Sequence, residues 1–165
     1  MLGAGAFAVV AATMPSFAQQ AMTKEQLIGS WKVLYLKATT GNNVSYPLGD
    51  KVGGFVTITP DRIWLLFVDA TRKAPLSATL TDAEAVSMMK SHVAWTGRYS
   101  TAEQTPQGLR LTAHVDAASS QAIADAERVY FAHVMGDNLV MTSPGVIVPM
   151  TGATSVVEFE MVKAN

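Results

Sequence analysis

Leu27-Ile28-Gly29-Ser30-Trp31-Lys32-Val33-Leu34 is the stretch that decides how this chain folds. Just before it, Thr23-Lys24-Glu25-Gln26 places Thr at a helix N-cap and Gln three residues later, the pattern of a capping box. We therefore expect a short helical turn and then a first strand that begins at the Gly-x-Trp sequence. Alternation along this strand places Trp31, Val33 and Tyr35 on one face.

Composition limits the function classes. The chain has 165 residues, which fits one domain, and 49% of them are hydrophobic, enough for a sizeable core. The net charge is −1 and the charges are well mixed, so no basic stripe is present to bind nucleic acid. Cysteine is absent, which excludes disulfides, thiol catalysis and Cys metal sites.

The N-terminal sequence resembles an export signal. Residues 2–16 are small or apolar and carry no charge, and Ser16 and Ala18 fit the pattern that a signal peptidase reads. We therefore expect residues 1–18 to be a signal peptide and residues 19–165 to be one domain in the periplasm or outside the cell. The apolar run is shorter than the roughly 20 residues of a membrane span, so no stable span is expected.

The remaining sequence reads mostly as short strands. Residues 55–59 and 63–68 are rich in β-branched and aromatic residues, and Thr59-Pro60-Asp61-Arg62 between them suits a tight turn, so they predict a hairpin. Further strands are expected at residues 95–100, 109–115, 128–135, 139–142 and 155–162.

One segment breaks the strand pattern. Thr81-Asp82-Ala83-Glu84 is a second capping box, and apolar residues at helical spacing follow it. A helix over residues 81–92, with Met88 and Met89 packed onto the barrel, is expected. Short turns between eight or nine strands favour an all-β, up-and-down antiparallel barrel with one short N-terminal helix and one inserted helix.

In order and spacing, several short pieces resemble the bacterial and fungal lipocalin-like domain family. They are Leu27-Ile28-Gly29-Ser30-Trp31, Tyr46-Pro47-Leu48-Gly49, Gly53-Gly54-Phe55, Thr59-Pro60-Asp61, Trp95-Thr96-Gly97-Arg98-Tyr99, His114-Val115-Asp116, Arg128-Val129-Tyr130 and Gly136-Asp137-Asn138-Leu139. The resemblance implies a barrel with a helix in mid-chain, in which Trp31 plugs the closed end. Some fungal relatives are isomerases or cyclases that act on terpenoid-like substrates.

Aromatic residues are the first candidates for a ligand surface, because an eight-stranded barrel encloses room for one small ligand. Trp95 and Tyr99 share a strand face, and Gly97 between them is expected to leave space between the two rings. Tyr35 and Trp64 are candidate walls from other strands. Ordinary core packing is the alternative for all four aromatic residues.

Polar candidates lie on two other strands. Alternation places Arg128 on the same face as Tyr130, so both point inward or both outward. A guanidinium inside a barrel is costly unless it is paired, which would suit an anionic ligand; a position at the rim, in water, is the alternative. The polar neighbours of His114 favour an outward face, whereas the resemblance favours an inward one. The face of His133, a further ligand-binding candidate, is also left open.

Two hypotheses about function follow. The first is an exported barrel that binds a small apolar or aromatic molecule, with Arg128 and His114 fixing a polar or anionic group. The second is a cofactor-free isomerase, cyclase or lyase, in which His114 transfers a proton and Arg128, with Tyr130, stabilises an oxyanion. A filled, purely structural barrel is a weaker third option. Neither a cofactor nor a metal is expected, since the three His lack ligand spacing, and a homodimer is left open.

Overall fold

The structure is a computed structural model that describes residues 21–148 and 151–164. The expected signal peptide therefore lies outside the described residues. The elements, in chain order, are α1 (Lys24–Leu27), β1 (Gly29–Thr40), β2 (Asn43–Ser45), β3 (Val52–Ile58), β4 (Arg62–Asp69), α2 (Asp82–Lys90), β5 (His92–Thr105), β6 (Gly108–Ala118), β7 (Glu127–Met135), β8 (Asn138–Ile147) and β9 (Thr154–Lys163). Neither helix in this part of the chain is long and apolar enough to cross a membrane.

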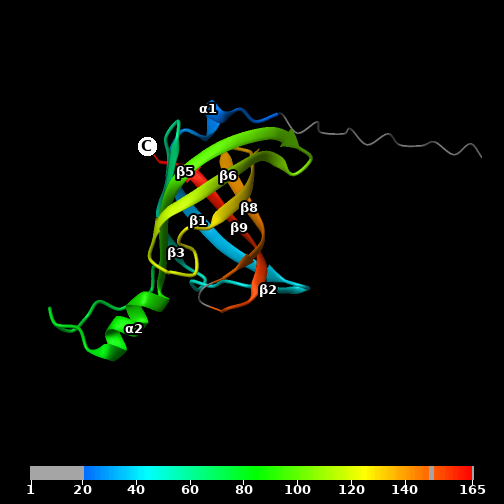
Figure 1. Cartoon of the computed structure of the whole chain (residues 1–165). Coiled ribbons are helices and arrows are strands. Elements are labelled where there is room, and N and C mark those ends of the chain that lie inside the picture. Colours follow the sequence, from blue (N-terminus) through cyan, green and yellow to red (C-terminus); the bar gives the residue numbers. More distant parts are fainter. Residues whose placement is uncertain (1–20, 149–150, 165) are drawn as a thin grey trace, which may run out of the picture.

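The strands form one antiparallel sheet that closes on itself. From β3 to β9 each strand pairs with the next in sequence, β1 pairs with β3, and a further pairing between β1 and β9 completes the circle (Figure 1). The short β2 lies outside this circle and pairs with one end of β1. The predicted all-β, up-and-down barrel with two small helices is confirmed, as an eight-stranded barrel with one extra strand.

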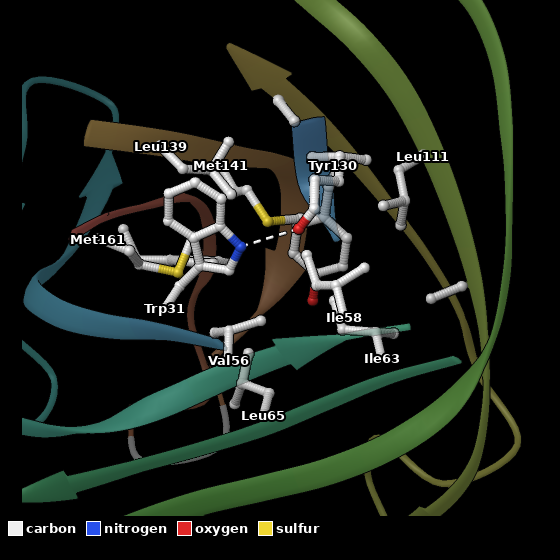
Figure 2. Packing of buried hydrophobic residues seen from close by; sticks show 14 of the residues in the cluster. Trp31, Val56, Ile58, Ile63, Leu65, Leu111, Tyr130, Leu139, Met141 and Met161 are labelled. Atoms are coloured by element: carbon white, nitrogen blue, oxygen red, sulfur yellow. Dashed lines mark hydrogen bonds between the residues drawn. The ribbon is translucent and has the colours of Figure 1, made fainter. Parts of the chain in front are cut away.

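Alternating burial along the strands builds the core. On β4, Ile63, Leu65 and Phe67 are buried, whereas Trp64 and Leu66 are exposed. Figure 2 shows the packed interior, in which side chains from β1, β3, β4, β6, β7, β8 and β9 converge: Trp31, Val56, Ile58, Ile63, Leu65, Leu111, Tyr130, Leu139, Met141 and Met161. Without disulfides, this core supplies much of the burial that holds the barrel together.

One end of the barrel is closed by α1 and the residues beside it. The expected capping box is present, since the Thr23 backbone N–H donates to the Gln26 side-chain oxygen at 2.8 Å. Leu27 is fully buried, and its carbonyl accepts a hydrogen bond of 2.8 Å from the Trp31 indole N–H. Tyr99 lies in the same core and donates to the Thr59 carbonyl at 2.7 Å. This end of the interior is therefore filled by side chains.

The inserted helix differs from the expectation in its packing. The predicted capping box holds its start: the Glu84 backbone N–H donates to the Thr81 hydroxyl at 3.3 Å, and the Thr81 N–H donates to Glu84 at 2.9 Å. None of the α2 residues is buried, however, and the helix extends away from the barrel (Figure 1). The prediction that Met88 and Met89 pack it onto the barrel is wrong, because the connection between β4 and β5 carries α2 beyond the sheet.

Candidate functional site

A small cavity lies inside the barrel, away from α1. Its volume is about 70 Å³. Its walls come from most strands of the barrel and from the segments at its far end: Leu36, Pro47, Leu65, Phe67, Val93, Trp95, Ile123, Arg128, Tyr130, Ser143, Val146, Ile147, Val148, Val157 and Phe159. Ile147 is more than half exposed, which places it on the solvent side of the cavity.

Four aromatic rings form the deeper part of this cavity. Trp95 and Tyr130 are stacked, with centroids 6.0 Å apart and planes inclined by 14°. Phe159 contacts the edge of Tyr130 at 5.8 Å and of Phe67 at 5.1 Å. Offset and edge-to-face contacts of this kind hold the rings in place, so one side of the cavity is a fixed aromatic wall.

One charged residue shares this apolar space. Among the described residues that line the cavity, Arg128 is the only charged one. Arg128 and Tyr130 point into the barrel from β7, as alternation requires, and Arg128 is partly buried. Burial raises the pKa of the Tyr130 phenol, and the positive charge of Arg128 opposes that shift. The phenol is therefore neutral at physiological pH and can donate a hydrogen bond.

The backbone pairing between β7 and β8 ends before it reaches Arg128. Within the described chain, the β7–β8 register runs from Phe131↔Thr142 to Met135↔Asn138, and the first residues of β7 extend beyond it. The Ser143 hydroxyl replaces a backbone hydrogen bond there, since it donates to the Val129 carbonyl at 2.7 Å. A register shift follows between Ser143 and Val146. Irregularities of this kind re-aim strands near binding sites, and here the β8 strand bends at the mouth of the cavity.

Some of the predicted site residues lie inside the barrel, and the others lie on its outer face. Trp95, Arg128 and Tyr130 line the cavity together. Tyr99 is also inside the barrel, but it belongs to the closed end and is not among the cavity walls.

The inward face predicted for Tyr35 is wrong. The register of β1 against β9 shifts between Val33 and Tyr35, so Leu36 takes the inward position instead. On the outer face, the Tyr35 hydroxyl donates to Glu158 at 2.6 Å, and Lys37 forms an ion pair with the same carboxylate at 2.6 Å. Burial and the Glu158 carboxylate raise the pKa of Tyr35.

The remaining candidates also lie on the outer face. Trp64 is 41% exposed and stacks under the Arg62 guanidinium, with 5.7 Å from its central carbon to the ring centroid. His114 is exposed and pairs across the sheet with Arg98 and Glu127, so the catalytic group of His114, Arg128 and Tyr130 does not converge. Three polar neighbours on the His114 face had indicated this outcome.

His133 lies opposite Val140 on the outer side of β7, away from the cavity. Its Nδ1 atom is buried and has no hydrogen-bond partner among the described residues. In residues 21–148 and 151–164, no three His, Asp or Glu side chains are placed to hold a metal ion.

The space expected at Gly97 is occupied by backbone. A Cβ atom at this position would lie 2.1 Å from the His114 carbonyl oxygen on β6. Gly97 therefore lets β5 and β6 approach each other at a register shift between Thr96 and Gly97. It leaves no room for a ligand between Trp95 and Tyr99.

A second hollow, about 450 Å³, lies outside the barrel on β3 to β6, where Phe55, Trp64 and Leu66 are exposed. It is larger than the interior cavity but shallow, and its described walls carry no charged residue. Small-molecule sites are enclosed, apolar and equipped with a few converging polar groups. By that standard the interior cavity is the better candidate, although its volume is below the roughly 300–1,000 Å³ of typical ligand sites.

The closed barrel, its plugged end and its interior cavity define a class of small barrels that hold ligands in their interior. A family model described as a lipocalin-like domain matches residues 28–161, and the chain belongs to this family. Searches of curated proteins and of solved structures found no match to this chain. The sequence-based resemblance to a lipocalin-like family is confirmed.

Proposed function

We propose that this protein is an exported lipocalin-like barrel that binds a small, largely apolar or aromatic molecule in its interior cavity. The observation that carries the proposal is the aromatic wall, in which Trp95 and Tyr130 are stacked beside an apolar space. A ligand ring that lies along this wall would replace water by aromatic contacts. The leader-like sequence of residues 2–18 supports export.

The size of the cavity limits how such a ligand binds. A volume of about 70 Å³ accommodates only part of a molecule with one or two rings. The ligand must therefore extend toward the mouth, where Pro47, Val146 and Ile147 lie, or move side chains at that end. The mouth is the part of the site where the β7–β8 pairing is incomplete, so we expect the adjustment there.

Native mass spectrometry of the mature protein purified from its own host is the first test. A retained small molecule supports the proposal, and its structure gives the ligand class. The second test is a titration with 2-naphthol, a small neutral aromatic probe, followed by the fluorescence of the probe. Saturable binding to the wild-type protein is expected.

Two neighbouring valines on β9 provide a matched pair of variants for this titration. Val157 lines the cavity, whereas Val156 is 42% exposed on the outer face. Val157→Phe should fill the mouth and weaken 2-naphthol binding at least tenfold, while Val156→Phe should bind like the wild type. Equal binding by the two variants, each shown to be folded by circular dichroism, would place the probe outside the cavity and contradict the proposal.

A further inference from the structure

We propose that the natural ligand of this barrel carries a single carboxylate, which binds the Arg128 guanidinium inside the cavity. This inference rests on the proposed function and adds the chemical class of the ligand to it. It starts from one unusual feature, a cation placed in a cavity whose other described walls are uncharged.

No carboxylate of the described chain neutralises Arg128. The ion pairs in residues 21–148 and 151–164 join Lys37 to Glu158 and Arg62 to Asp116, and both lie on the outer face. The neighbouring acid on β7, Glu127, is exposed and takes the opposite side of the strand from Arg128. The cation therefore faces the cavity with its charge available to a ligand.

Burying part of a guanidinium beside apolar side chains costs free energy unless an anion or a set of acceptors compensates. A methionine or leucine at the same place would fill the space at no such cost. Destabilising polar groups of this kind are characteristic of binding sites, where they gain their partner from the ligand. The position of Arg128 is thus better explained by an anionic ligand than by the stability of the barrel.

The donor set limits the charge and shape of that anion. The Ser143 hydroxyl has one proton and already donates it to the Val129 carbonyl, so it has none left for a ligand. This leaves the guanidinium fork of Arg128, the neutral phenol of Tyr130 and the indole N–H of Trp95 as side-chain donors at the cavity, and only the guanidinium is charged. One cation balances one negative charge, and the planar fork matches a carboxylate through two parallel hydrogen bonds.

The order of residues along β7 orients the ligand. Arg128 is the second residue of the strand, and Tyr130 lies two residues nearer the closed end of the barrel. A carboxylate on Arg128 would therefore sit toward the mouth, with the apolar body deeper, against the stacked pair of Trp95 and Tyr130. A small aromatic or short-chain monocarboxylic acid satisfies both parts of the site.

Isothermal titration calorimetry with 2-naphthoate and 2-naphthamide tests this proposal. The two probes have nearly the same shape and differ in charge. We expect the wild-type protein to bind the acid about 30-fold more tightly than the amide, the scale of an interaction with a desolvated charge. This comparison of the two affinities uses only the wild-type protein, so it does not depend on whether a variant folds.

Variants then assign the effect to Arg128. Arg128→Met should abolish the preference for the acid, whereas Arg110→Met, the same change at an exposed position of β6, should retain it. Equal binding of acid and amide by the wild type would overturn the carboxylate while leaving the proposed function intact. A preference that survives in folded Arg128→Met would overturn the role of Arg128. Binding of neither probe at millimolar concentration would overturn both proposals.

Discussion

Replacing Gly97 with alanine should destabilise the barrel by about 3 kcal/mol or more. The new methyl group would lie 2.1 Å from the His114 carbonyl oxygen and 2.8 Å from the carbonyl carbon. Both atoms belong to the β6 backbone, which cannot move aside as a flexible side chain can. Relief of the contact requires β5 and β6 to separate by about 1 Å where their register already shifts.

Gly53→Ala is the matched control, because Gly53 lies in another strand of the same barrel. Its new methyl group would meet the Val68 side chain at 3.4 Å and the Ala70 side chain at 3.7 Å, which are ordinary contacts. This control should be within about 1 kcal/mol of the wild type, since alanine also restricts the unfolded chain. Urea unfolding followed by circular dichroism measures both variants.

For a chain of this length, the expected loss in Gly97→Ala corresponds to a melting temperature lower by about 6–12 °C. A difference of less than about 1 kcal/mol between the free energies of unfolding of the two alanine variants would show that a Cβ atom at position 97 does not clash with the β6 backbone. If Gly97 instead left open space between Trp95 and Tyr99, that small difference would be expected.

Three further predictions concern the closed end, the outer face and the expected signal peptide. Trp31→Phe removes the indole donor to the buried Leu27 carbonyl and should cost about 1–3 kcal/mol in urea unfolding, with faster amide exchange in α1. Burial raises the pKa of Glu158, but hydrogen bonds, including that from Tyr35, outweigh it and hold the pKa below its ordinary value of 4.5. The ionised carboxylate therefore stabilises the folded protein above about pH 4.5, and this stabilisation is lost as the pH falls through the lowered folded-state pKa of Glu158. Between pH 5 and about pH 3, the wild type should lose more free energy of unfolding than Glu158→Gln. The intact mass of the protein purified from its host should correspond to a chain that begins at Gln19, and a mass that includes residues 1–18 would contradict cleavage there.

The fold was predictable because its determinants are local. Capping boxes at Thr23 and Thr81, turn residues between apolar runs, and the Gly-x-Trp entry to the first strand each specify one element. The order of these elements then leaves an up-and-down barrel as the simplest closed arrangement. The packing of α2 was not predictable, because its apolar residues follow a helical period although the helix buries none of them.

The candidate site was predictable only where alternation along the strand is unbroken. On β7, alternation correctly puts Arg128 and Tyr130 on one face. On β1, a register shift that no residue type announces turns Tyr35 outward. On β4, both faces carry large apolar residues, so the sequence gives no reason to exclude Trp64 from the interior.

Other walls of the cavity were missed although a pattern indicated them. Phe67 follows Ile63 and Leu65 at a spacing of two, and Phe159 precedes Met161 in the same way, so each continues a buried apolar face. Ser143 carried no sequence pattern of its own. Its role depends on the end of the β7–β8 pairing, which is a property of the closed barrel and not of the local sequence.

The most direct test of a ligand site inside the barrel is a titration of the ¹⁵N-labelled protein with 2-naphthoate, followed by two-dimensional amide NMR. A ligand inside the barrel should cause saturable shifts that centre on Arg128, Ser143 and Val157, where β7, β8 and β9 line the cavity. Shifts that centre instead on Phe55 and Trp64, in the outer hollow of β3 and β4, would contradict a ligand site inside the barrel.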